Sequence, residues 1–124
     1  MSPSSLIIGG ITVGFPFVMA APLISEVLPD FLEEVVHLLQ GSSAEPLEAQ
    51  LRSLRIESMC DCGDENCASF ATAAEVKVAN VVELQALEGH LIIDLNADEK
   101  ICFIEVLGRP DVRYLLEEYQ ESLK

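Results

Sequence analysis

The stretch LIIDLNADEKICFIEVL, residues 91–107, is the part of the chain that decides the fold. It contains two apolar runs, 91–95 and 101–106, on either side of the polar segment 96–100. Apolar runs of this length joined by a short polar turn are typical of a β-hairpin. The sequence therefore predicts two antiparallel strands here, with Cys102 in the middle of the second.

A helix is expected directly after this hairpin. Gly108 ends the second strand, and Pro110 followed by Asp111 is favourable in the first turn of a helix. Apolar side chains then recur at helical spacing, which predicts an inward-facing stripe formed by Val112, Leu115, Leu116, Tyr119 and Leu123. Glu117, Glu118 and Glu121 are expected to face water.

Two helices are predicted upstream of the hairpin. The first begins at Pro29 and stops at Gly41, with an apolar face made of Phe31, Leu32, Val35, Val36 and Leu39. The segment 20–28 adds a helical turn or two before it. The second helix is short and begins near Pro46, and it places Leu47, Leu51 and Leu54 on one side.

The chain between these helices and the hairpin has the alternating pattern of strands. After residue 54 the period changes to two, which puts Leu54, Ile56 and Ser58 on one side and Arg55, Glu57 and Met59 on the other. Further strands are expected at 70–72 and 76–84. The order predicts an α+β fold in a single domain, residues 1–124: N-terminal helices, a mainly antiparallel β-sheet with meander or hairpin connections, and a C-terminal helix.

The charge balance limits the classes of partner. The chain has 21 acidic and seven basic residues, a formal net charge of −14. Binding to nucleic acid or to anionic membranes depends on lysine and arginine, so we expect neither. The excess negative charge favours a basic protein partner, which it would attract electrostatically. The simpler alternative is that the acidic surface serves solubility alone.

Residues 6–24, LIIGGITVGFPFVMAAPLI, form an uncharged run long enough to span a bilayer in principle. Its glycines and prolines interrupt a straight helix, and basic residues flank neither end. We expect a soluble core segment that is extended over 6–13, with a membrane or signal segment and an exposed docking arm as alternatives. A positive N-terminal region typical of secretion is also missing, which favours the cytoplasm. An apolar segment of this kind favours self-association, for example as a homodimer.

The segment CDCGDENC, residues 60–67, is the one most suited to chemistry. It places Cys60, Cys62 and Cys67 within eight residues on a loop rich in turn-forming residues. Thiolates are good ligands for tetrahedral zinc, although the usual pairs of C-x2-C are not present. Three interpretations stay open: a structural zinc or other metal site, reduced thiols in a tight turn, or a disulfide or redox pair.

Several residues are candidates for a fourth ligand. His90 and Cys102 are available, and the loop itself contributes the carboxylates Asp61, Asp64 and Glu65. Cys102 is more typical of a small buried side chain, and His90 and His37 are more typical of surface histidines. The acidic neighbours should raise the pKa values of the loop thiols and lower their reactivity.

Motifs for catalysis are missing from the sequence. The chain has no glycine-rich phosphate loop, and neither histidine has a recognisable nucleophile beside it. Asp94 and Glu105 lie on the two strands of the predicted hairpin and can approach each other, as solvated charges or as an acid–base pair. We therefore expect a protein that is not an enzyme.

Two segments resemble known proteins. Residues 91–107, with Ile93-Asp94-Leu95 and Ile104-Glu105-Val106-Leu107, are similar to the strand-turn-strand of small bacterial domains of unknown function. Residues 60–72, CDCGDENCASFAT, resemble a cysteine-bearing segment of small uncharacterised bacterial proteins that also contain such a hairpin. The resemblance covers about a third of the chain and implies a bacterial cytoplasmic protein, but no activity. The usual turn glycine is replaced by Glu99-Lys100.

Two functions follow from these features. The first is a protein-interaction module, such as an immunity or antitoxin-type inhibitor that binds a basic partner through complementary charge. The second is a small structural zinc-binding domain that uses the loop thiols Cys60, Cys62 and Cys67.

Overall fold

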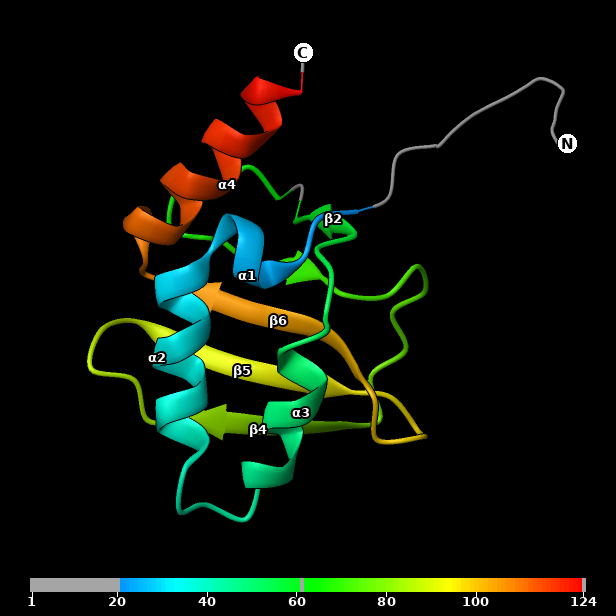
Figure 1. Cartoon of the computed structure of the whole chain (residues 1–124). Helices are drawn as coiled ribbons and strands as arrows, with labels where there is room; N and C mark the ends of the chain where they lie inside the picture. Colours follow the sequence, from blue (N-terminus) through cyan, green and yellow to red (C-terminus); the bar gives the residue numbers. More distant parts are fainter. Residues whose placement is uncertain (1–20, 61, 124) are drawn as a thin grey trace, which may run out of the picture.

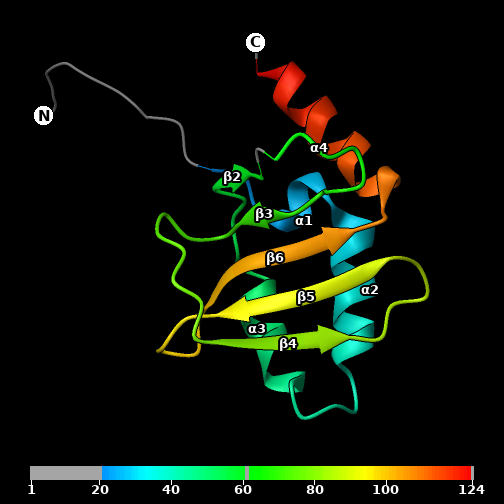
Figure 2. The same ribbon diagram turned by 180° about the vertical axis from the view of Figure 1, so that it is seen from behind.

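The computed structural model describes residues 21–60 and 62–123. These residues form a five-stranded antiparallel sheet in the order β2-β3-β6-β5-β4. Helices α1, α2 and α3 cover one face of the sheet (Figure 1), and the view from behind shows the other face without a helix over β4, β5 and β6 (Figure 2). The elements are α1 (Ile24–Val27), α2 (Pro29–Leu39), η1 (Glu45–Leu47), α3 (Glu48–Leu51), β2 (Ser58–Met59), β3 (Phe70–Ala71), β4 (Asn80–Leu84), β5 (His90–Leu95), β6 (Ile101–Leu107) and α4 (Pro110–Ser122). The predicted α+β class is confirmed.

The β5–β6 hairpin forms the centre of the sheet, as predicted. Its register pairs Leu91 with Val106 and Ile93 with Ile104, so these four side chains share the face that packs against the helices. The turn is closed by the side-chain oxygen of Asn96, which accepts hydrogen bonds from the amides of residues 98 and 100 at 2.9 and 3.0 Å. Glu99 adopts a left-handed φ of 62° where a glycine is more usual.

The core lies between this face of the sheet and α2. All five predicted apolar residues of α2 are buried, because their helical spacing places them in one stripe. Phe31 of α2 meets Phe70 of β3 edge to face, with ring centroids 6.5 Å apart. Burying a side chain of this size contributes about 1.5–3 kcal/mol, so the apolar stripe of α2 stabilises the packing of the helix on the sheet.

The predicted alternation over residues 54–59 is wrong at its end. Ile56 is buried as expected, but Ser58 is exposed, and Met59 packs against the core. The reason is a change of backbone partner. The amide of Ile56 donates to the carbonyl of Pro22, whereas the amide of Glu57 donates to Ala71 of β3. A strand that changes neighbours does not keep one face inward throughout.

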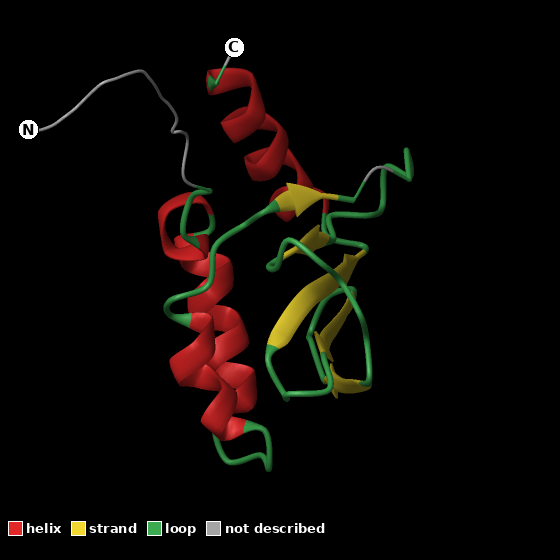
Figure 3. Cartoon of the chain, turned by 90° about the vertical axis from the view of Figure 1, so that its right-hand side faces the viewer, coloured by secondary structure: helices red, strands yellow, loops and turns green. Residues whose placement is uncertain are grey.

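β4 is shorter than predicted, and α4 buries less of its predicted inner stripe. β4 begins at Asn80, so Val76 and Val78 lie outside the strand and are exposed. In α4 only Val112 and Leu116 of the predicted inner stripe are buried. The C-terminal part of the helix extends beyond the strands (Figure 3), and its side chains are less buried there. The sequence pattern correctly predicted which face of α4 turns inward, but not how far along the helix this face is buried.

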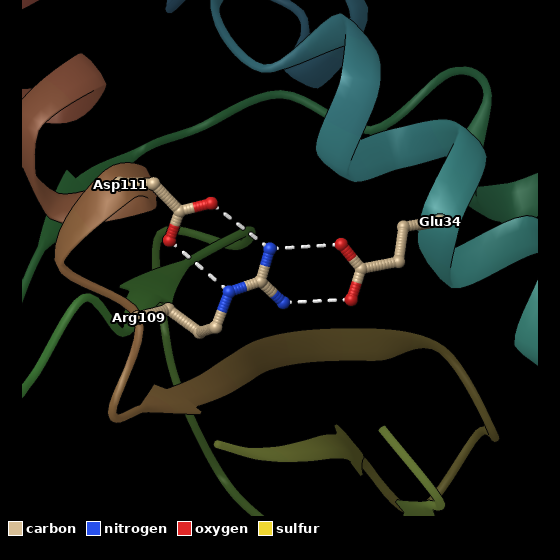
Figure 4. Close-up of polar contacts among 3 residues, drawn as sticks. All are labelled: Glu34, Arg109 and Asp111. Carbon is tan, nitrogen blue, oxygen red and sulfur yellow. Dashed lines mark hydrogen bonds and ion pairs between the residues drawn. The ribbon is translucent and has the colours of Figure 1, made fainter. Parts of the chain in front are cut away.

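A buried ion pair joins α2 to the junction between β6 and α4 (Figure 4). The side chain of Arg109 is 7% exposed, and its guanidinium donates to both carboxylate oxygens of Glu34 at 2.6 and 2.8 Å. It also donates to both oxygens of Asp111 at 3.0 and 3.1 Å. Hydrogen bonding to Glu34 and then to Asp111 raises the pKa of Arg109, and the same guanidinium lowers the pKa of Asp111. The charge of Arg109 is therefore fully compensated within the fold.

The extended segment predicted at 6–13 lies outside the described residues, as does most of the apolar run 6–24. Ile24, at the end of that run, is buried at the start of α1. Among residues 21–60 and 62–123, no helix combines the length and apolar character needed to cross a membrane.

Candidate metal centre

The three predicted ligand cysteines lie in the loop that connects β2 to β3. Cys60 follows β2 directly, and its amide donates to the carbonyl of Ser69 at 2.9 Å, which closes the base of the loop. Cys67 lies opposite Leu107 of β6 in an isolated antiparallel bridge. One end of the loop is therefore fixed to the central strand of the sheet.

The three sulfur atoms converge. The Sγ atoms of Cys60, Cys62 and Cys67 all lie within 4.8 Å of one another, and the chain's four cysteines are free thiols. Cys67 is buried, Cys60 is half-buried and Cys62 is exposed. In a tetrahedral zinc site with Zn–S bonds of about 2.3 Å, the sulfurs are about 3.8 Å apart. A contraction of about 1 Å at the exposed end of the loop is enough to reach this spacing.

Residues 63–67 give the loop its shape. Gly63 has a φ of +77°, a conformation that favours glycine, and the amide of Cys67 donates to the carbonyl of Asp64 at 3.0 Å. The side chain of Asp64 accepts a hydrogen bond from the amide of Asn66 at 2.8 Å. Asp64, a predicted candidate ligand, is thus used to form the turn.

Arg113 of α4 holds the loop from the other side. Its guanidinium donates to the backbone carbonyls of Asp64 and Cys67, the latter at 2.8 Å, and it forms an ion pair with Glu117 at 3.1 Å. The sequence does not reveal this contact, because 46 residues separate the partners. A cation this close to the loop partly offsets the negative charge that three thiolates would bring.

Ser69 supports the buried cysteine and was also missed from the sequence. Its hydroxyl oxygen accepts hydrogen bonds from the Sγ of Cys67 at 3.4 Å and from the amide of Val106 at 2.9 Å. Ser69 is buried, so this contact fixes the position of the sulfur. Its spacing of two residues from Cys67 is the only signal that could have pointed to it.

The thiol pKa values differ from the expectation that acidic neighbours raise them. Burial raises the pKa of Cys60 to about 11, with a further contribution from its hydrogen bond with Cys62. Burial also acts to raise the pKa of Cys67, but hydrogen bonds from Ser69, Cys62 and Cys60 outweigh it, and the pKa is lowered. The causes of the two shifts are therefore burial and hydrogen bonds among the thiols and Ser69, rather than the acidic side chains of the loop.

The other candidate ligands lie apart from this cluster. Within the parts of the chain that the structure describes, the convergent group comprises the three cysteines alone. Cys102 is fully buried in β6, where its thiol donates to the carbonyl of Asp94 at 3.5 Å. His37, His90 and Glu65 are exposed. Asp61 lies outside the described residues.

The carboxyl pair on the β5–β6 hairpin is not a pair of solvated charges. Asp94 is only 4% exposed, and one of its carboxylate oxygens has no hydrogen-bond partner. Burial, followed by the hydrogen bond and the charge of Glu105, raises its pKa from 3.8 to about 7. The two side chains share the face of the sheet opposite the helices, because Asp94 pairs with Phe103 and Ile92 pairs with Glu105.

Replacing Asp94 with asparagine should make folding less sensitive to pH. Between about pH 4 and 7, folded Asp94 retains a proton that the unfolded chain has released, so stability falls as the pH rises. Above pH 7 we expect Asp94→Asn to be more stable by about 2 kcal/mol, half of what the full shift allows, because a carboxylate can move toward water. Urea unfolding at pH 5 and pH 8, with chelator and reductant present, measures this difference.

Glu83→Gln is the matched control for that measurement, since Glu83 is an exposed carboxylate on the neighbouring strand β4. It removes the same charge from the same side of the sheet. Equal gains in stability at pH 8 for the two variants would show that general repulsion, rather than the buried carboxyl, is responsible.

No protein-family model, curated protein or solved structure matches the chain. The resemblance of residues 60–72 and 91–107 to small bacterial proteins therefore stays a prediction.

Proposed function

We propose that the protein is a small zinc-binding module in which Cys60, Cys62 and Cys67 hold the metal as thiolates. The observation that carries this proposal is the convergence of the three sulfurs within 4.8 Å. Zinc suits the site because it prefers thiolate ligands and tetrahedral geometry. Because Cys62 is exposed, water can supply the fourth ligand.

The role of the metal would be structural. β2 and β3 have two residues each, and strands this short contribute little stability by themselves. An ion held by Cys60 and Cys67 ties the end of β2 to the segment that pairs with β6. Metal binding would therefore stabilise this edge of the sheet and the contact of its loop with Arg113.

Zinc should raise the stability of the folded chain. At free zinc a hundredfold above the dissociation constant, mass action adds about 2.7 kcal/mol. Elemental analysis of protein purified under reducing conditions without a histidine tag should find one zinc per chain. The melting temperature should rise on adding zinc and fall on adding chelator.

Cys62→Ser is the informative variant, because Cys62 is exposed and its replacement should leave the metal-free fold unchanged. This variant should lose the zinc-dependent shift, whereas Cys102→Ala should keep it, since Cys102 lies outside the cluster. Cobalt substitution then counts the thiolates through the sulfur-to-cobalt absorption. A protein without metal, whose melting is the same with and without chelator, would contradict the proposal.

We propose binding of a basic protein partner as a second function, supported by the distribution of charge. Arg52, Lys77, Arg109 and Arg113 all form ion pairs with acidic residues of the same chain. Much of the positive charge is thus neutralised internally, while the net charge is −14. The remaining acidic surface favours association with cations and would increase the association rate. An immunity or antitoxin-type inhibitor is one protein class with this property.

A low-salt pull-down with the full chain tests this second function. The recovered proteins should be predominantly basic and should be released as salt is raised, because exposed charges are screened. Recovery of nothing basic would contradict it.

A further inference from the structure

One edge of the sheet is exposed and apolar. β4 is the last strand in the sheet order, and among residues 21–60 and 62–123 no strand pairs with its outer edge, so the outward amides and carbonyls there can accept a further strand. Val81 is 59% exposed, and exposed apolar residues also lie before and after the strand in the sequence. Exposed large apolar residues in this part of the chain are Val76, Val78, Val81 and Leu87. We refer to residues 76–87 as the β4 edge.

The β4 edge has little of the protection that edge strands normally have. Proline and inward-pointing or lone lysine residues prevent strands from pairing with other chains. Residues 76–87 contain no proline and one lysine, Lys77, which forms an ion pair with Glu75 at 3.7 Å. A free edge of this kind can add a strand from another chain, with backbone hydrogen bonds supplying affinity and alternate side chains supplying specificity.

Charge indicates the chemistry of the added strand. Glu83 is exposed on the β4 edge, and Glu88 is exposed directly after it. Val81 and Glu83 lie on the same face of the sheet, because they pair with Asp94 and Ile92 of β5. A strand placed beside β4 would therefore bring an apolar side chain next to Val81 and a basic one next to Glu83.

We propose that the β4 edge binds an extended segment of a partner protein in which basic and apolar residues follow one another, adding a sixth strand to the sheet. This inference rests on the second proposed function and names the surface that it uses. The β4 edge and the cysteine loop lie at opposite sides of the sheet (Figure 2), so binding here is independent of zinc.

A second copy of the chain fits this edge less well. Antiparallel pairing of two β4 strands about Val82 would place Glu83 opposite Val81, leaving the carboxylate without a cation. It would also bring together two chains that each carry a net charge of −14. Repulsion between like charges disfavours pairing of two copies, so a basic segment is the better occupant.

Peptide binding to the full-length chain tests the proposal. The probe is a fluorescent, acetylated peptide of sequence Lys-Val-Val-Lys-Val-Val-Lys, measured by anisotropy at low salt. It should bind, whereas the same peptide with glutamate in place of lysine, or with alternate amides N-methylated, should not. Equal binding of the basic and acidic peptides would overturn the charge requirement, and equal binding of the N-methylated peptide would overturn strand addition.

Val81→Lys should weaken binding of the basic peptide by about tenfold, because it replaces an apolar contact by a like charge. Leu123→Lys is the matched control, since Leu123 is 56% exposed and lies directly after α4. Cys62→Ser should bind like the parent chain. Unchanged binding by Val81→Lys would overturn the β4 edge as the binding surface but leave the basic-partner function in place. The same conclusion would follow if the peptide fails to bind while the pull-down recovers basic proteins. Dimerisation of the parent chain that Val81→Lys abolishes would instead identify a second copy as the occupant and overturn the proposal.

Discussion

Replacing Glu34 with alanine is expected to lower the free energy of unfolding by about 3 kcal/mol, because it leaves a buried cation partly uncompensated. Arg109 is 7% exposed and donates to both carboxylate oxygens of Glu34. Asp111 would remain as a partner, but its side chain is 62% exposed and holds only one side of the guanidinium. Urea unfolding of the parent and the variant gives the difference.

Glu33→Ala is the control for this prediction, because it is the preceding residue in the same helix. Glu33 forms an ion pair with Arg52 at 3.1 Å, and both side chains are largely exposed. Exposed ion pairs contribute little to the free energy of unfolding, since water screens them. We expect Glu33→Ala to behave as an ordinary surface substitution. Similar losses for the two variants would contradict the view that burial of Arg109 causes the effect.

Gly89→Ala is expected to have a comparable or larger effect, about 3 kcal/mol or more, because overpacking adds to backbone strain. Gly89 has a φ of +69°, and a Cβ atom placed there would lie 2.1 Å from the carbonyl oxygen of Leu107. It would also approach Arg109, whose Cγ lies 3.2 Å away. Thermal and urea unfolding should show a much less stable protein or one that does not fold.

Gly41→Ala separates the two causes. Gly41 also has a left-handed backbone, with a φ of +80°, but a Cβ atom there meets nothing within 4 Å. For Gly41→Ala, only the free-energy cost of a left-handed backbone at a residue with a Cβ atom remains, about 1–2 kcal/mol. If both variants lose the same stability, the close approach between Gly89 and Leu107 is not important for folding.

The helices and the central hairpin were predictable because local rules define them. The apolar stripe of α2 and the turn between β5 and β6 each follow from residues close together in the sequence. The length of α4 in contact with the core was not predictable, since it depends on where the sheet ends. The inward side chains over 54–59 were also predicted wrongly at Ser58, because this segment pairs first with Pro22 and then with Ala71.

The candidate site was predictable only in part. The spacing of Cys60, Cys62 and Cys67 identifies the thiols, since they lie within one short loop. The supports of this loop come from elsewhere: Arg113 lies on α4, and the hydroxyl of Ser69 is fixed by the amide of Val106. Neither contact leaves a pattern in the sequence.

The sequence by itself determined the α+β class, the order of its elements, the negative charge and the identity of the three clustered thiols. These properties depend on composition and on spacing over a few residues. Only the tertiary structure decided that the sulfurs converge, that Asp94 and Arg109 are buried, and that β4 is the last of the described strands at one side of the sheet. Burial and proximity arise when strands and helices distant in the chain pack together, and this packing changes the pKa of Asp94 and compensates the charge of Arg109.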